Sequence, residues 1–282
     1  MYETIVYIRN SLETIYPPEE IRSLTQWILE KVCNLSRHQQ ILCKDKQLSH
    51  TEKQTIRTIV QRLQLSEPIQ YIFGETEFCG IPFKVSPSVL IPRPETEELV
   101  HSIIQEQTAT HLCILDIGTG SGCIAVTLAK RLTGARVYAL DISEEALTIA
   151  KQNAQQNDAS VQFVQADILA PVNPEDISLP LFDLIVSNPP YVTMREKAAL
   201  KPNVSAYEPH AALFVPDDDP VIFYRRIVEL SCDLLTANGL LYFEINALFG
   251  EKIGRILRQK GYREIELRKD LSGKERFIKA KR

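Results

Sequence analysis

The chain has 282 residues, of which 44% are hydrophobic and 24% are charged, and its formal net charge is −4 at pH 7. This composition is typical of a globular protein with one large or two small domains. A net negative charge argues against sequence-independent binding to nucleic acid, which requires many exposed Lys and Arg residues. No apolar run approaches the roughly 18 residues that a membrane-spanning helix needs.

The six cysteines are scattered and include no Cys-x-x-Cys pair, and the five histidines show no metal-binding spacing. We therefore expect no metal site and no disulfide framework, and we expect a cytoplasmic location, where thiols stay reduced. The first residues lack a basic segment followed by an apolar core, so no signal peptide is expected.

Helices are predicted in the N-terminal region, because apolar residues recur with helical spacing over residues 5–15 and 21–32. Ser49 and Glu52 have the spacing of a capping box. They predict the start of a third helix, whose apolar face lies over residues 56–63. These apolar faces must be buried against one another or against a partner.

We interpret residues 1–67 as a small helical domain. Basic and acidic residues nearly balance over residues 1–70, whereas a nucleic-acid-binding module is usually more basic. Docking of a protein partner fits this balance better. Plain structural packing is an equally good interpretation of the same pattern.

Residues 68–95 differ from the helical region, because glycine and proline stand between aromatic and β-branched residues. This pattern predicts a β-hairpin, which we interpret as a connector between domains. Prolines followed by acidic residues at 92–98 predict the start of a helix. Within this segment Arg93 either binds a carboxylate of a substrate or cofactor, or forms an ion pair within the protein.

From residue 111 the chain alternates between strand-like and helix-like segments, which predicts a parallel sheet covered on both faces. A strand over 112–115 leads into a glycine-rich loop at 116–122, and a helix follows over 123–132. Glycines let the backbone approach a ligand, but the G-x-G-x-G spacing departs from the dinucleotide fingerprint. An acid ahead of such a loop suits a sulfonium nucleoside. Asp116 would lie near its ammonium group, and loop N–H groups would face its carboxylate.

Strands predicted over 136–140 and 161–164 are each followed by an acidic residue. Asp141 is placed to accept hydrogen bonds from two ribose hydroxyls, and its alternative role is to cap the next helix. Asp167 could meet an adenine amino group, and Ile168 could pack on the adenine ring. The carboxyl ends of parallel strands form one edge, so these groups and the glycine-rich loop would share a site.

A fourth strand, residues 182–187, runs into the turn Asn188-Pro189-Pro190-Tyr191. Residues before proline are extended and prolines have no N–H, so the turn presents carbonyl oxygens without a neighbouring donor. Asn188 adds a side-chain oxygen and Tyr191 an aromatic face. Such a slot would accept two hydrogen bonds from a planar –NH2 group, which suits methylation of an amide or a ring amino group. The alternative is that the prolines merely end the strand.

The segment after Tyr191 is predicted to be irregular to about residue 220 and to serve as a lid or substrate wall. We interpret residues 217–219 as a solvated turn rather than a cation site, and His210 as structural rather than as a general base. The other predicted elements are a loop over 171–180, helices over 221–235 and 249–260, a strand over 240–245 and a hairpin of 263–269 with 275–280.

Together these motifs resemble one family, the HemK/PrmC glutamine N5-methyltransferases that modify peptide-chain release factors. The Asn-Pro-Pro-Tyr turn alone is shared with adenine-N6 methyltransferases, so the stretch Val-Leu-Ile-Pro-Arg-Pro-Glu-Thr-Glu at 89–97 makes the resemblance specific. The likeness covers most of the chain. The other matching stretches are Phe73-Gly74, residues 116–122, Asp141-Ile142-Ser143, residues 187–191 and Glu208-Pro209.

The resemblance implies an α/β fold at residues 96–282, with the Rossmann-like class I methyltransferase sheet of seven mostly parallel strands. It implies a helical substrate-docking domain at 1–67 and a β-hairpin connector at 68–95. The implied methyl donor is S-adenosyl-L-methionine, with S-adenosyl-L-homocysteine as product. The implied acceptor is the glutamine of a release factor's Gly-Gly-Gln (GGQ) motif, with no membrane partner and no direct nucleic-acid binding.

The motifs and the resemblance together assign the site residues. The cofactor would be bound by Asp116, Gly118, Thr119, Gly120, Ser121, Gly122, Asp141, Asp167, Ile168 and Asn188. The glutamine amide would be bound by Asn188, Pro189, Pro190 and Tyr191, of which Asn188, Pro189 and Tyr191 would be catalytic. The chain departs from the family in carrying Ile168 where an aromatic is common, and in lacking a glycine-rich turn over residues 214–220.

We expect an in-line SN2 transfer without a dedicated general base. The alternatives left open are a ribosomal-protein glutamine as acceptor, adenine-N6 methylation of nucleic acid, and a non-catalytic assembly factor that binds the cofactor. The absence of a basic recognition domain disfavours nucleic acid, and the intact glycine-rich loop and Asn-Pro-Pro-Tyr turn argue against the assembly factor.

Overall fold

The computed structural model describes residues 1–42, 45–170 and 179–282. Most of the loop predicted over 171–180 therefore lies outside the described residues. The chain divides into two compact units. The N-terminal unit comprises Met1–Phe73 and Lys201–Tyr207, and the sheet unit comprises Gly74–Leu200 and Glu208–Arg282. The domain bounds inferred from the sequence, 1–67, 68–95 and 96–282, are predictions of another kind, and this division into compact units does not replace them.

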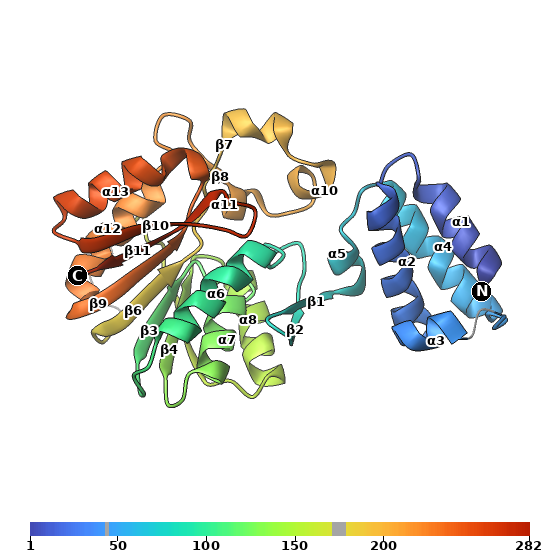
Figure 1. Cartoon of the computed structure of the whole chain (residues 1–282), viewed down its shortest axis with the longest axis horizontal. Coiled ribbons are helices and arrows are strands. Elements are labelled where there is room, and N and C mark those ends of the chain that lie inside the picture. The colour runs from blue at the N-terminus through green and yellow to red at the C-terminus, as the bar shows by residue number, and fades with distance from the viewer. Residues whose placement is uncertain (43–44, 171–178) are drawn as a thin grey trace. The chain divides into compact units, whose positions relative to one another are not determined.

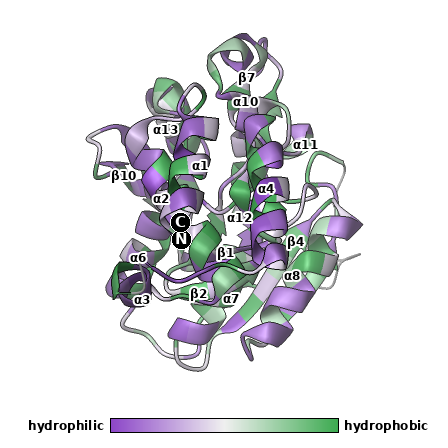
Figure 2. Ribbon diagram, turned by 90° about the vertical axis from the view of Figure 1, so that its right-hand side faces the viewer, coloured by the Kyte–Doolittle hydropathy of each residue, from purple (hydrophilic) through white to green (hydrophobic). Residues whose placement is uncertain are grey.

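The N-terminal unit is helical, as its periodicity predicts. Amphipathic helices bury Ile8, Leu12, Ile28 and Val60 in a common core, and α4 carries both hydrophilic and hydrophobic residues (Figure 2). Its helices are α1 (Tyr2–Leu12), α2 (Pro18–Cys33), α3 (Arg37–Leu42), α4 (His50–Gln64), α5 (Ile69–Phe73) and α10 (Pro202–Ser205).

The predicted helix boundaries are largely confirmed. The capping box at the start of α4 is present, because Glu52 N–H donates to Ser49 Oγ at 3.1 Å and Ser49 N–H donates to Glu52 Oε2 at 2.6 Å. The apolar face of α1 was predicted to continue to Ile15, and this is wrong. The helix ends at Leu12 and Ile15 is 41% exposed, because the chain turns there ahead of Pro17.

The hairpin that opens the sheet unit consists of β1 (Glu75–Phe78) and β2 (Ile81–Lys84), which pair antiparallel. Cys79 and Gly80 both have positive φ, as a two-residue hairpin turn of the primed type requires. Helix α6 (Pro94–Glu106) follows and carries Pro94 in its first turn, as the sequence predicts.

The sheet has seven strands in the order β10-β11-β9-β6-β3-β4-β5, and only β11 runs against the others (Figure 1). The predicted Rossmann-like, mostly parallel α/β sheet is therefore confirmed. The strands are β3 (Cys113–Ile117), β4 (Arg136–Asp141), β5 (Val161–Gln165), β6 (Phe182–Ser187), β9 (Leu235–Glu244), β10 (Arg263–Lys269) and β11 (Glu275–Lys281).

Helices cover both faces of this sheet, and each face has its own apolar core. Successive residues of β3 alternate between the cores: Ile114 belongs to one, and Leu115 and Ile117 belong to the other. One core includes residues of α6, α7 (Cys123–Arg131) and α8 (Glu144–Gln156). The other includes residues of α12 (Ile222–Leu234) and α13 (Gly250–Gln259).

The stretch predicted to be irregular after Tyr191 contains short ordered elements. Two-residue strands β7 (Val192–Thr193) and β8 (Phe214–Val215) pair parallel. Between these strands in the chain lie the short helices η1 (Met194–Ala199) and α11 (His210–Leu213). A third short helix, η2 (Ala247–Phe249), follows β9. Among the helices described, none has the length and hydropathy to span a membrane.

Candidate active site

The candidate site lies where neighbouring parallel strands end. Ile117 of β3 pairs with Leu140 of β4 on one side and with Ser187 of β6 on the other. Because these strands end level with one another, the residues that follow them emerge at the same edge of the sheet. The glycine-rich loop, Asp141 and the turn at 188–191 are thereby brought together.

The glycine-rich loop is open toward solvent at its first two glycines. Gly118, Gly120 and Gly122 all have positive φ. A Cβ added at Gly118 or Gly120 would meet no atom within 4 Å, so a ligand can approach the backbone there. At Gly122 a Cβ would lie 3.0 Å from Cβ of Ala150, so this glycine lets α7 pack against α8.

Several N–H groups of this loop already have partners within the protein. Those of Gly118 and Thr119 donate to the Leu140 carbonyl, that of Gly122 to the Thr119 carbonyl, and that of Gly120 to Asp141 Oδ2. The expectation that the loop's N–H groups face a ligand carboxylate is therefore wrong for these four. Three of them fix the loop to the end of β4 instead, and that of Gly122 closes a turn within the loop.

Asp116 is fully buried beneath the loop. Its Oδ2 accepts hydrogen bonds from Thr119 Oγ1 at 2.6 Å and from Ala125 N–H at 3.2 Å. Its Oδ1 has no partner among the described residues. Burial raises the pKa of Asp116 to about 7, against the lowering effect of the two hydrogen bonds. A buried carboxylate oxygen without a partner is costly, and a cationic ligand group would offset that cost.

Asp141 fixes the loop rather than capping the next helix. Its Oδ2 accepts from Gly120 N–H at 2.8 Å and its Oδ1 from Ser143 N–H at 3.0 Å. The N-cap of α8 is Ser143, whose Oγ accepts from Ala146 N–H. Burial raises the pKa of Asp141. Each carboxylate oxygen keeps a lone pair, so the residue retains the capacity to accept from a pair of hydroxyls.

Asp167 and Ile168 follow β5 at the same edge. Asp167 is exposed, and its Oδ1 accepts from Leu169 N–H at 2.9 Å. Ile168 is 9% exposed and belongs to the apolar core under α12, and its carbonyl accepts from Arg226 Nε at 2.8 Å. Ile168 is thus held in place by the core, and only a small part of it remains available to a ligand.

Asn188 begins a hydrogen-bonded chain that sequence reasoning missed. Asn188 Nδ2 donates to Thr96 Oγ1 at 3.2 Å, and Thr96 Oγ1 donates to Glu244 Oε2 at 2.6 Å. Tyr191 OH donates to the other oxygen, Oε1, of Glu244 at 3.1 Å. A charged residue at the end of the apolar strand β9 was the available signal for Glu244. Thr96 was interpreted as part of a helix start and of the family-specific stretch 89–97, with no role of its own.

Glu244 is 1% exposed, and burial raises its pKa against the lowering effect of the hydrogen bonds from Thr96 and Tyr191. Burial also raises the pKa of the Tyr191 phenol, with the Glu244 charge acting in the same direction. The turn is held from other sides too. Asn246 Nδ2 donates to the Tyr191 carbonyl, and Ser187 Oγ donates to the Ile117 carbonyl.

Arg93 forms an ion pair within the protein, which is the second of the two roles predicted for it. Its Nη2 lies 2.5 Å from Glu208 Oε1, and Glu208 Oε2 accepts from Ile91 N–H at 3.1 Å. The Glu208 side chain has no exposed area. This buried carboxylate fixes the segment around residue 208 to the segment that precedes α6.

The other candidate residues, in the stretch between Tyr191 and residue 220, have interaction partners within the protein. The His210 ring makes an edge-to-face contact with Phe214, with 5.1 Å between ring centroids. Asp217 accepts from Arg195 N–H, and Asp219 pairs with Arg225 at 2.7 Å. Within the described ranges, no group of three His, Cys, Asp or Glu residues is arranged to bind a metal.

Comparison with known proteins identifies relatives over the whole chain. The family model of the methyltransferase small domain matches residues 95–204, and that of the PrmC N-terminal domain matches residues 3–74. The chain is 47% identical to a release factor glutamine methyltransferase of Bacteroides thetaiotaomicron, covering 100% of both chains. It is 45% identical to one of Flavobacterium psychrophilum, covering 95% of this chain and 94% of the relative.

Solved structures share the fold at lower identity. A methyltransferase from Pyrococcus furiosus is 17% identical and has a TM-score of 0.53, over 72% of this chain and 89% of the other. A 16S rRNA N2 G1207 methyltransferase of Thermus thermophilus is 16% identical, also with a TM-score of 0.53, over 74% of this chain and 49% of the other. At these identities the comparison supports the fold alone.

We expect Asp116→Asn to reduce the pH dependence of stability. Because the folded pKa of Asp116 lies above its ordinary value, the folded protein binds more protons than the unfolded chain between about pH 4 and pH 7. Stability therefore falls as the pH rises through that range, on the order of 2–3 kcal/mol between about pH 5 and about pH 8. Urea unfolding at the two pH values measures this, and the Asn variant should lose most of the difference.

The matched control for this prediction is Asp218→Asn, which makes the same chemical change at an exposed residue. That variant should keep the pH dependence of the unchanged protein. An Asp116→Asn protein whose stability falls with pH as steeply as that of the control would contradict the assignment.

Proposed function

The chain belongs to the family of release factor glutamine methyltransferases, and we propose that it methylates the side-chain amide nitrogen (N5) of the glutamine in the GGQ motif of peptide-chain release factors, with S-adenosyl-L-methionine as donor and S-adenosyl-L-homocysteine as product. The observation that carries this proposal is the turn at residues 188–191, which follows β6 beside the glycine-rich loop that follows β3, and in which no described residue donates to Asn188 Oδ1.

The residues at the strand ends fit the cofactor. Asp116, with its unpartnered buried Oδ1, would neutralise the ammonium group, and Asp141 would accept from the ribose hydroxyls. Asp167 and Ile168 would border the adenine. The open backbone at Gly118 and Gly120 leaves room for the ligand. When bound, S-adenosylmethionine supplies a methyl group on a sulfonium, an electrophile strong enough to react with a weak nucleophile.

Asn188 and Pro189 would orient and activate the glutamine amide. Because Asn188 Nδ2 faces Thr96, its Oδ1 is the atom left to accept a hydrogen bond, and no described residue donates to it. The Pro189 carbonyl would be the second acceptor. Amide resonance, which raises the rotation barrier to about 18–20 kcal/mol, makes the nitrogen a poor nucleophile. Two acceptors favour its tetrahedral form, at roughly 1–3 kcal/mol each.

Orientation supplies the larger part of the catalysis, roughly 7–11 kcal/mol for well-placed reactants. Pro190 would help to shape the turn, and the Tyr191 ring would stack on the amide plane while its hydroxyl is held by Glu244. The methylated nitrogen is tetrahedral and strongly acidic. Its proton can leave to water, so the reaction needs no dedicated general base.

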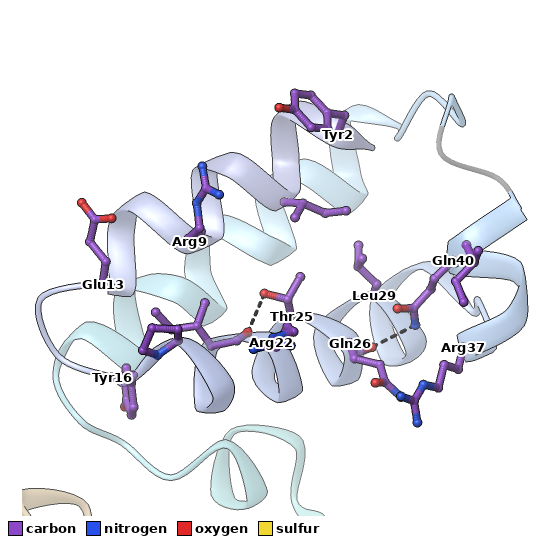
Figure 3. A pocket seen from close by; sticks show the side chains of 14 residues that line it. Tyr2, Arg9, Glu13, Tyr16, Arg22, Thr25, Gln26, Leu29, Arg37 and Gln40 are labelled. Atoms are coloured by element: carbon purple, nitrogen blue, oxygen red, sulfur yellow. Dashed lines mark hydrogen bonds between the residues drawn. The ribbon is translucent and has the colours of Figure 1, made fainter.

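The N-terminal unit is proposed to dock the protein substrate. A cavity of about 810 Å³ lies in this unit between α1, α2 and α3 (Figure 3). Arg9, Arg22 and Arg37 line it, are exposed, and form no ion pair with any described residue. An apolar floor that includes Leu29 and a lining in which three arginines outnumber one acidic residue, Glu13, suit an acidic, partly apolar segment of the release factor.

We also place the protein in the cytoplasm. The scattered cysteines, which include no Cys-x-x-Cys pair, favour a reducing compartment. The proposed acceptor, a release factor, belongs to the same compartment as the translating ribosome.

The first test is methyl incorporation from labelled S-adenosylmethionine into a purified release factor. We expect label in the release factor and none in its Gly-Gly-Gln→Gly-Gly-Ala variant, because the amide nitrogen is the acceptor. Label in both proteins would mean a different acceptor residue. If neither protein is labelled although the cofactor binds, the proposed acceptor is wrong, and ribosomal proteins and nucleic acids should then be assayed.

Asn188→Ala and Asp141→Ala should separate catalysis from cofactor binding. Removing the Asn188 acceptor should lower kcat about 100-fold and leave the Kd of S-adenosylmethionine within about 3-fold, because that oxygen acts on the amide. Removing Asp141 should instead raise this Kd at least about 10-fold. Calorimetry and single-turnover rates measure the two effects. Parallel losses of affinity and rate in both variants would contradict these roles.

Charge reversal on the rim of the cavity tests the docking role. Arg9→Glu combined with Arg22→Glu should raise the KM for the release factor about 10-fold and leave kcat unchanged, because rim charges act mainly on association. The control is Arg255→Glu, an exposed arginine of α13 in the sheet unit. Equal KM values in the double variant and the control would rule out docking at this cavity.

A further inference from the structure

The hydrogen-bonded chain behind Asn188 joins three segments of the sheet unit. Asn188 follows β6, Thr96 lies in the first turn of α6, and Glu244 ends β9. The side chains of Thr96 and Glu244 are almost fully buried, with 2% and 1% of their areas exposed. Neither reaches solvent, and neither belongs to the residues proposed to bind the cofactor or the glutamine.

We propose that Thr96 and Glu244 are positioning residues for the methyl transfer, because they determine which end of the Asn188 side-chain amide faces the substrate. This inference rests on the proposed function. It adds the group that aligns the acceptor oxygen with the glutamine –NH2.

The direction of the hydrogen bonds follows from the number of protons available. The Thr96 hydroxyl has a single proton, and it donates that proton to Glu244 at 2.6 Å. The Thr96 oxygen can therefore only accept from Asn188, so the Asn188 atom that faces it must be Nδ2. The carbonyl oxygen Oδ1 of the same planar amide then points away from Thr96.

Loss of this chain would remove the preference. Without the Thr96 oxygen, the Asn188 amide can rotate by half a turn about its last bond. Its –NH2 group would then face the –NH2 group of the glutamine, so two donors would meet and the acceptor would be lost. A fraction of the enzyme would hold the substrate with its nitrogen inactive.

Glu244 acts on both sides of the turn. The groups that face its oxygens, Thr96 and Tyr191, are both hydroxyl donors, which suits an ionised carboxylate. Arg276 contributes positive charge nearby and pairs with Asp270 at 3.4 Å. One carboxylate therefore fixes the hydroxyl of Tyr191 directly and the amide of Asn188 through Thr96.

The test compares Thr96→Val with Thr96→Ser. Valine keeps the shape of threonine but cannot accept from Asn188, so kcat should fall about 10- to 100-fold. The KM for the release factor and the Kd of S-adenosylmethionine should both stay within about 3-fold. Serine keeps the hydroxyl of threonine, so Thr96→Ser should keep kcat within about 3-fold of the unchanged protein.

The matched control is Thr127→Val. Thr127 is also fully buried, but its Oγ1 has no hydrogen-bond partner among the described residues. The same substitution there should leave kcat unchanged, which separates loss of the hydroxyl at Thr96 from loss of any buried hydroxyl. Thermal unfolding of each variant shows whether the fold is retained.

If Thr96→Val does not fold, Glu244→Gln tests the same chain with a side chain of equal size. It should also lower kcat with the cofactor Kd unchanged. The –NH2 group of a glutamine can donate to Thr96, whose own hydroxyl proton can then be donated toward Asn188. The inference is overturned if the kcat of Thr96→Val, or that of Glu244→Gln, equals the kcat of the unchanged protein. If the unchanged protein does not methylate the release factor, the proposed function fails, and this inference fails with it.

Discussion

The level ends of three adjacent parallel strands are the constraint on which the site depends. The pairing of β3 with β4 and with β6 places the residues after Ile117, Leu140 and Ser187 at one edge. A shift of a strand by one residue would turn its side chains to the opposite face. The two apolar cores fix this register, because successive residues of β3 belong to opposite cores.

Buried and half-buried carboxylates connect this edge to the segments around it. Asp141 binds the glycine-rich loop, Glu208 binds Arg93, and Glu244 binds Thr96 and Tyr191. Removing one partner from such a group is costly, so each carboxylate defines one arrangement of its neighbours. Asp116 differs from these three, because one of its oxygens has no partner among the described residues.

The elements that the sequence predicted best depend on neighbours close in the chain. The capping box of Ser49 and Glu52 and the β-hairpin within residues 68–95, which turns at Cys79-Gly80, are both present and depend on residues close in the chain. The glycine-rich loop was located correctly, but its N–H groups were assigned to a ligand, whereas four bind within the protein. Their acceptors lie on β4 or within the folded loop, and no local pattern reveals that pairing.

The sequence by itself determined the alternation of the main strands and helices along the chain, the fold class and the two motifs at the site, because periodicity, glycine and proline act locally. Only the tertiary structure decided which side chains meet. Thr96 and Glu244 are 148 positions apart, and Arg93 and Glu208 are 115 apart. Such pairs form only when the sheet assembles and brings distant segments of the chain together. The hydrogen bonds that orient Asn188 exist only in that folded arrangement.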